Sequence, residues 1–160
     1  RRGFFKKIFN SNQYEDNQLK SDFKEIYYTK SKKNVIRGMH FQIPPYEHCK
    51  LVSIVNGEVL DVVLDLRKHS MTYGKFFSIY LREMSDIVIY IPKGFAHGFK
   101  SLQDNTVVEY YVTSVYNSEF DCGIRWDSFG FDWQIQNPII SERDKGFPPF
   151  IEFMERNPFK

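Results

Sequence analysis

The sequence predicts an all-β fold, a jelly-roll barrel with a short C-terminal helix or loop flap. Short apolar runs are separated by turn residues, which is typical of sandwiches and barrels. The composition is rich in aromatic residues, with 16 Phe and 10 Tyr among 160 residues, and such side chains pack well on pleated sheets. The expected strands are 50–55, 58–66, 75–82, 87–91, 97–102 and 106–113.

Turn and helix signals describe the remaining segments. Asn56-Gly57 separates the first two expected strands, and this dipeptide supplies the positive φ angles of a tight two-residue hairpin. After Asp127 the pattern becomes irregular. One helix is expected at 149–156, with Pro149 in its first turn, where its missing N–H is tolerated.

Composition limits the class of protein. We expect one domain over residues 1–160, because 42% hydrophobic residues are enough for a folded core. The net charge of +2 gives no support to a nucleic-acid partner. Cys49 and Cys122 have neither metal-site spacing nor the pattern of a disulfide framework. No apolar run reaches the length of a membrane span, and nothing resembles a signal peptide, so we expect a cytoplasmic protein without membrane contact.

Strand parity brings polar residues toward one cavity. Alternate residues of a strand face the same side, so His97 shares a face with Phe99, and Tyr110 faces inward between two valines. Lys50 lies on the apolar side of its strand, and His40 lies in a run that otherwise indicates a buried strand. Polar groups that converge inside a barrel indicate a ligand site. Taken singly, each residue is more often an ordinary core or rim residue.

A metal site is the first functional interpretation to consider. The segment PKGFAH at 92–97 resembles the second motif of the cupin superfamily, whose histidine often binds a metal. Metal-binding cupins also need two histidines one residue apart, and here the corresponding segment, MHFQ at 39–42, has Gln42 in the second place. Two histidines without a well-placed carboxylate make a poor site for a transition metal. We therefore expect a metal-free cupin, with a metal-dependent cupin enzyme as the alternative.

Further motifs occur in an order that resembles the sugar-nucleotide 3,5-epimerase family. That family consists of metal-free cupins that act as homodimers and, without a cofactor, invert the carbons beside a 4-keto group. The resemblance implies an epimerase that inverts C3, C5 or both in a nucleotide-diphosphate-linked 4-keto-6-deoxy sugar, for surface-polysaccharide biosynthesis. The matching motifs are RRGFF at 1–5, RGMHFQ at 37–42, KLV at 50–52, GEVLDVVLDLR at 57–67, IPKGFAHGF at 91–99, GIRWD at 123–127 and PIISERD at 138–144.

The resemblance assigns a role to each catalytic residue. His40 is the base, and a neutral imidazole suits proton abstraction near pH 7. Lys50 stabilises the enolate and helps to keep His40 neutral. Tyr110 returns the proton on the opposite face, and Asp144 holds and polarises His40. A non-catalytic sugar-nucleotide-binding cupin is the other alternative, although binding alone needs no base and acid on opposite sides.

The resemblance also implies a set of substrate-binding residues. Arg2 and Arg37 match arginines that contact the diphosphate, where a guanidinium suits phosphate oxygens. In the family the early segment reaches into the partner subunit, so it completes a neighbouring site. His97 lies near the sugar, and an aromatic at position 116 packs on the nucleotide. Ordinary surface positions are the alternative for residues 2 and 116. The full set is Arg2, Phe5, Lys7, Arg37, His97 and Tyr116.

Two departures from the family pattern concern the substrate. Lys7 stands where the family commonly has a glutamate that accepts a hydrogen bond from thymine. A lysine offers only donors, which suits an acceptor-rich base such as guanine. Tyr27 and Tyr28, in EIYYT at 25–29, replace smaller polar residues near the sugar pocket. These changes favour a GDP-linked 6-deoxy-4-keto sugar, such as a heptose.

Overall fold

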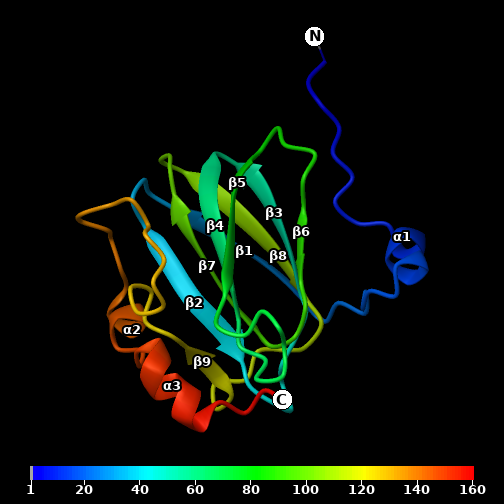
Figure 1. Ribbon diagram of the computed structural model, residues 1–160. Coiled ribbons are helices and arrows are strands. Elements are labelled where there is room, and N and C mark those ends of the chain that lie inside the picture. Colours follow the sequence, from blue (N-terminus) through cyan, green and yellow to red (C-terminus); the bar gives the residue numbers. More distant parts are fainter. Residues whose placement is uncertain (1) are drawn as a thin grey trace.

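The computed structural model, which describes residues 2–160, confirms a jelly roll built from two antiparallel sheets (Figure 1). The four-stranded sheet has the order β1-β8-β3-β6, and the five-stranded sheet has the order β5-β4-β7-β2-β9. The strands are β1 (Glu25–Ser31), β2 (Ile36–Gln42), β3 (Lys50–Asn56), β4 (Glu58–Asp65), β5 (Phe76–Arg82), β6 (Ile89–Ile91), β7 (Phe95–Ser101), β8 (Thr106–Val112) and β9 (Asp121–Gly123). The helices are α1 (Ser11–Asp16), α2 (Glu142–Lys145) and α3 (Phe150–Arg156).

Two hydrophobic clusters hold the layers together. One lies between the sheets, where Val52, Phe99 and Val108 are almost fully buried. The other lies on the outer face of the five-stranded sheet, where Leu64 of β4 and the C-terminal Phe159 belong to one cluster. Side chains along β4 and β7 alternate between the two faces of the sheet, so each face contributes residues to one of the two clusters. The chain after β9 therefore covers the outside of this sheet and leaves the space between the sheets to polar groups at one end.

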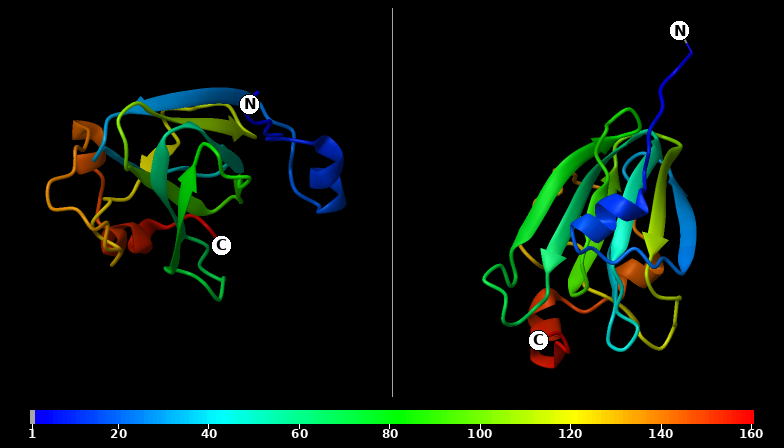
Figure 2. Two further views of the ribbon diagram at one scale, coloured as in Figure 1. Left: turned by 90° about the horizontal axis from the view of Figure 1, so that it is seen from above. Right: turned by 90° about the vertical axis from the view of Figure 1, so that its right-hand side faces the viewer.

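The N-terminal segment packs on the other side of the molecule. Tyr14 of α1 lies edge-on to Tyr90 with ring centroids 5.8 Å apart, and Phe23 does the same to Tyr111 at 5.7 Å. The residues before α1 instead extend away from the barrel (Figures 1 and 2). Phe4 is 62% exposed there. No helix among residues 2–160 is long and apolar enough to span a membrane.

The predicted hairpin at Asn56-Gly57 is wrong. β3 belongs to the four-stranded sheet and β4 to the five-stranded sheet, so the chain crosses between sheets at this dipeptide. Of the two residues only Gly57 has a positive φ, of 84°. A Cβ atom on Gly57 would lie 2.5 Å from the Thr106 hydroxyl oxygen. The glycine therefore permits the crossing chain to pass close to Thr106 at the start of β8.

The other expected elements agree with the structure to within a few residues. The expected strands at 75–82, 87–91 and 97–102 correspond to β5, β6 and β7. The expected helix corresponds to α3, although Pro149 is its N-cap residue and not part of its first turn. β1, β9, α1 and α2 were not among the expected elements, and β1 and β9 each lie at the edge of a sheet.

Candidate active site

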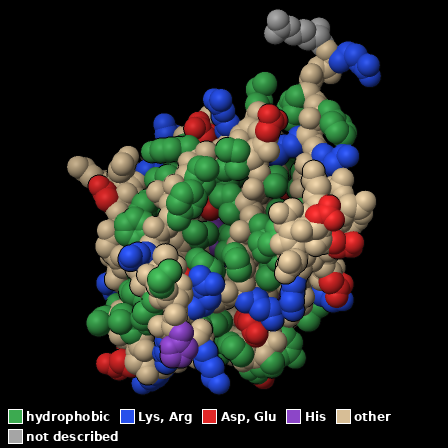
Figure 3. Space-filling view, turned by 45° about the vertical axis from the view of Figure 1, so that its right-hand side comes forward, with side chains coloured by type: hydrophobic (Ala, Val, Ile, Leu, Met, Phe, Trp, Pro, Cys, Tyr) green, Lys and Arg blue, Asp and Glu red, His purple; other side chains and the backbone are tan. Residues whose placement is uncertain are grey.

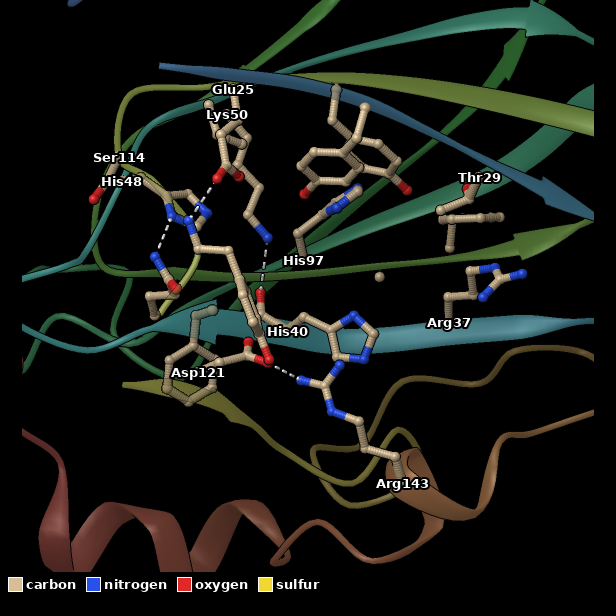
Figure 4. A pocket seen from close by; sticks show the side chains of 18 residues that line it. Glu25, Thr29, Arg37, His40, His48, Lys50, His97, Ser114, Asp121 and Arg143 are labelled. Atoms are coloured by element: carbon tan, nitrogen blue, oxygen red, sulfur yellow. Dashed lines mark hydrogen bonds and ion pairs between the residues drawn. The ribbon is translucent and has the colours of Figure 1, made fainter. Parts of the chain in front are cut away.

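A cavity of about 450 Å³ opens between the two sheets (Figure 4). Strands of both sheets contribute to it, so side chains face one another across the space. Of the residues expected to converge, all four line this cavity. Its polar lining includes Glu25, Thr29, Arg37, His40, His48, Lys50, His97, Tyr110, Asp121 and Arg143.

Arg37 and His40 both reach the cavity because β2 is irregular. Residues three apart on a regular strand face opposite sides, but the register of β2 against β7 shifts between Arg37 and His40. Gly38 lies within this shift with a φ of 127°. A Cβ on Gly38 would lie 2.5 Å from the Cα of Gly98. The two glycines therefore allow the strands to approach closely where the strand is re-aimed.

His40 and Asp144 form a hydrogen-bonded pair at one wall. Their Nε2 and Oδ1 atoms lie 2.8 Å apart. The second oxygen of Asp144 accepts the N–H of Gly38 at 3.1 Å, and the Ser141 hydroxyl accepts the Asp144 N–H as the N-cap of α2. Asp144 is therefore fixed by both its backbone and its carboxylate.

Burial and neighbouring charges set the protonation of this pair. Burial lowers the pKa of His40 below its usual range, and the positive charge of Lys50 acts in the same direction, against the raising effect of Asp144. Burial alone would raise the pKa of Asp144, but the hydrogen bond from His40 and other bonds keep it low. At neutral pH the pair is a neutral imidazole beside a carboxylate.

Lys50 lies inside the cavity and is 6% exposed. Its Nζ donates a hydrogen bond to the backbone carbonyl of His40 at 3.2 Å. Burial lowers the pKa of Lys50 to about 8, against the raising effect of Asp121 and Asp61. The ammonium form therefore predominates at pH 7, in a place where water is largely excluded.

Tyr110 of β8 faces the cavity from the opposite sheet. It is 5% exposed, and its ring lies edge-on to His97 with centroids 6.0 Å apart. On its other side it stacks against Tyr27 of β1. Burial raises the pKa of Tyr110 well above its usual value, so the phenol is protonated at neutral pH.

Sequence reasoning missed charged groups in the cavity wall and directly behind it. Asp61 of β4 lies 2.8 Å from Nε2 of His97, and both side chains are almost fully buried. Asp121 of β9 pairs with Arg143 of α2 at the cavity wall. Asp61 lies in the middle of an otherwise apolar run of β4, and this position is the signal that could have indicated it.

The expected binding residues divide into two groups. Arg37, His97 and Tyr116 line the cavity. Arg2, Phe5 and Lys7 do not line it, and they lie in the exposed N-terminal segment that extends away from the barrel. These three residues are therefore not part of the cavity of their own chain.

The expectation for Tyr28 is wrong, whereas that for Tyr27 holds. Tyr27 lines the cavity. Tyr28 is the next residue along β1, so its side chain lies on the other face of the sheet, where it is 71% exposed. Only Tyr27 can therefore affect what the cavity binds.

The described residues that line the cavity do not form a metal centre. Within residues 2–160, no three His, Cys, Asp or Glu side chains are gathered as metal ligands. Three histidines line the cavity. His40 and His97 each use one ring nitrogen on a separate carboxylate, and Nδ1 of His48 lies 3.1 Å from the amide nitrogen of Gln42. The alternative of a metal-dependent cupin therefore gains no support from the residues present.

Comparison with known proteins identifies the family. The family model for dTDP-4-dehydrorhamnose 3,5-epimerase matches residues 1–152. This chain belongs to that family. The dTDP-4-dehydrorhamnose 3,5-epimerase of Methanothermobacter thermautotrophicus is 39% identical, over 94% of this chain and 84% of the relative. The Escherichia coli (strain K12) enzyme of the same name is 38% identical, over 90% of this chain and 80% of the relative.

Solved structures of family members superpose closely on the chain. The Legionella pneumophila epimerase in complex with dTDP-4-keto-L-rhamnose has a TM-score of 0.92 and 30% identity, covering 99% of this chain and 86% of that one. The Bacillus anthracis dTDP-4-dehydrorhamnose 3,5-epimerase with TDP and PPi bound has a TM-score of 0.90 and 33% identity, covering 93% and 87%. The predicted cupin jelly roll and the predicted class, a sugar-nucleotide epimerase, are confirmed.

Proposed function

We propose that this protein inverts C3, C5 or both in a nucleotide-diphosphate-linked 4-keto-6-deoxy sugar. The observation that carries the proposal is the placement of His40 on one sheet and Tyr110 on the other, with Lys50 lining the same cavity. A base and an acid on opposite walls are what inversion at a carbon requires.

Proton abstraction is the first step. Because Nε2 of His40 donates to Asp144, Nδ1 carries the lone pair that takes the proton from the carbon beside the ketone. The electron pair of the broken C–H bond forms the C=C bond of an enolate, and the ketone oxygen gains a negative charge. The Lys50 ammonium stabilises that charge, and in a site with little water this stabilisation is worth about 3 kcal/mol.

Protonation from the opposite side is the second step. Tyr110 transfers its phenolic proton to the enolate carbon, whose electron pair forms the new C–H bond with inverted configuration. The positive charge of Arg37, which lowers the pKa of this phenol, helps to stabilise the phenolate left behind, and water later restores its proton. His40 loses its extra proton to solvent, so no cofactor is consumed.

Substrate binding involves both ends of the cavity. Arg37 would hold the diphosphate, since a guanidinium matches phosphate oxygens. Tyr116, which is 61% exposed at the rim, would pack on the nucleotide base. His97, held by Asp61, would contact the sugar. The names of the solved relatives favour a dTDP sugar as the first candidate.

A homodimer would complete the site. The N-terminal segment extends away from its own barrel (Figure 3), and Phe5 in it is 84% exposed. Exposed apolar side chains on an extended arm are typical of a protein contact. We propose that Arg2, Phe5 and Lys7 reach the cavity of the partner, where Arg2 contacts the diphosphate. Lys7 would then meet the base, which keeps a GDP-linked sugar, such as a heptose, as the second candidate.

Exchange with heavy water tests the proposal. Purified protein is incubated in D₂O with a dTDP-linked and, separately, a GDP-linked 4-keto-6-deoxy sugar, and NMR follows each ring proton. We expect deuterium at C3 or C5 and an inverted product with one of them. Binding of either sugar nucleotide without any exchange would contradict an epimerase and support the non-catalytic binding cupin.

A further inference from the structure

A second phenol shares the wall on which Tyr110 lies. Tyr27 and Tyr110 are cross-strand partners in the pairing of β1 with β8. Their rings stack with centroids 4.8 Å apart and planes inclined by 18°. Both side chains line the cavity and belong to the four-stranded sheet. His40 lies on the opposing sheet, so two hydroxyl groups share the side opposite the base.

The surroundings of the two phenols place them toward different ends of the cavity. Burial raises the pKa of Tyr27 to about 12, and the carboxylates of Glu25 and Asp121 add to this effect. For Tyr110 the neighbours that oppose the effect of burial include Thr29 and the guanidinium of Arg37. In Figure 4, Glu25 and Asp121 lie at one end of the cavity, and Thr29 and Arg37 lie at the other.

The proposed reaction has a task for a second donor. C3 and C5 lie on either side of the 4-keto carbon, so a hydroxyl placed for one carbon is displaced from the other. A second hydroxyl on the side opposite the base would bring a donor within hydrogen-bond distance of the other carbon. Two phenols at two positions along one wall match two carbons at two positions in one ring.

We propose that Tyr27 is a second proton donor, which serves one of the two carbons beside the ketone while Tyr110 serves the other. This inference rests on the proposed epimerase function. The O–H bond of Tyr27 breaks, the enolate electron pair forms the new C–H bond, and a phenolate remains. Tyr27 is 41% exposed, so water at the cavity mouth can return its proton. Tyr110, at 5%, has far less access to water.

The stack also has a packing role, which a well-chosen substitution preserves. Tyr27→Phe keeps the ring and removes only the hydroxyl, and Tyr110→Phe does the same for its partner. Tyr28→Phe is the matched control, since Tyr28 is the next residue of the same strand and its side chain is 71% exposed on the other face. Thermal unfolding of all three variants checks that the fold survives.

The test measures each carbon separately. Wild type and variants react in D₂O with the accepted 4-keto sugar nucleotide, and NMR gives deuterium exchange and configuration at C3 and at C5. We expect Tyr27→Phe to exchange both protons and to invert one carbon normally, with inversion of the other reduced by roughly 100-fold, the lower range for a lost general acid. Tyr110→Phe gives the reverse pattern, and Tyr28→Phe matches wild type.

Several results would overturn the inference. If the Tyr27→Phe variant inverts C3 and C5 in the same ratio as the wild type, the hydroxyl of Tyr27 is not a donor. If this variant loses inversion equally at both carbons, Tyr27 acts on substrate binding or on packing. Wild type that inverts a single carbon removes the need for a second donor and leaves the proposed epimerase function intact. Absence of exchange in the wild type is the failure of that function itself.

Discussion

His40 and Asp144 are 104 residues apart in the sequence, and their side chains meet at 2.8 Å. The carboxylate is buried and has two hydrogen-bond partners, the imidazole and the Gly38 N–H, and the backbone N–H of Asp144 donates to the Ser141 hydroxyl. This arrangement fixes the tautomer of the imidazole, with Nδ1 unprotonated. Asp144 thus acts through His40 as a positioning residue.

Removal of the Asp144 charge should slow proton abstraction. For Asp144→Asn we expect kcat to fall by roughly 100-fold or more, because the amide does not hold the required tautomer. Asp144 raises the pKa of His40, so the acid limb of the pH–rate profile should move to lower pH. Asp22→Asn, at an exposed ion pair with Lys24, is the control. A near wild-type rate with an unshifted acid limb would contradict this role.

Activity should fall on the alkaline side as Lys50 loses its proton. The pKa of Lys50 is about 8, and only the ammonium stabilises the enolate, so kcat/KM should decline above about pH 8. A guanidinium keeps its charge at much higher pH. Lys50→Arg should therefore lack this limb, whatever its absolute rate. A wild-type profile that stays level to about pH 10 would argue against Lys50 as the stabilising cation.

The burial of the Lys50 charge should lower the free energy of unfolding. Lys50 in the folded protein has a pKa of about 8 instead of 10.5, which corresponds to about 3 kcal/mol at roughly 1.4 kcal/mol per tenfold. The unfolded chain holds the proton more tightly, so this cost is fully present below pH 8 and disappears as pH rises toward 10.5. Lys50→Met should be more stable than wild type at pH 7, by up to about 3 kcal/mol, although inactive.

Denaturant unfolding at two pH values checks this prediction. The difference in the free energy of unfolding between Lys50→Met and wild type should shrink from pH 7 to pH 10. The lost hydrogen bond to the His40 carbonyl reduces the gain without changing its dependence on pH. A methionine variant that is less stable at pH 7 and shows the same difference at pH 10 would contradict the assigned cost.

Mixed dimers should show whether the N-terminal segment completes the partner's site. His40→Asn lacks the base, and Arg2→Ala lacks the proposed phosphate contact. In a heterodimer of the two variants, one site combines an intact His40 with the partner's intact Arg2. Random mixing should restore about a quarter of wild-type activity, because half of the dimers carry one such site. Sedimentation of an active monomer, or no recovery on mixing, would contradict the arrangement.

Strands with strong apolar patterns were predictable from the sequence, whereas long-range arrangement was not. β3, β4 and β8 are dense in Val, Leu and Ile. β1 has the sequence EIYYTKS. It was missed because its outward residues Ile26 and Tyr28 are as apolar as its inward ones, so no contrast between faces remains. The crossing at Gly57 was read as a hairpin because local turn chemistry does not say which sheet the next strand joins.

The candidate site shows the same division. Parity placed Lys50 and Tyr110 correctly, because β3 and β8 pair in continuous register around these two residues. Asp61 was missed because nothing in the sequence of β4 distinguishes its carboxylate from those of Glu58 and Asp65 until its partner His97 is known. Asp121 and Arg143 come from segments without regular patterning, and only folding brings them together at the cavity wall. Tertiary pairing of this kind leaves no trace in a single sequence.

Solvent exchange by the His40→Asn variant tests the central claim most directly. The wild-type enzyme and the variant are incubated in D₂O with the accepted 4-keto sugar nucleotide, and NMR measures deuterium at the carbons beside the ketone. We predict that exchange disappears in His40→Asn, while circular dichroism and nucleotide binding stay close to wild type, since His40 is the base and contributes little to the fold. Exchange at a near wild-type rate in this variant would contradict the claim.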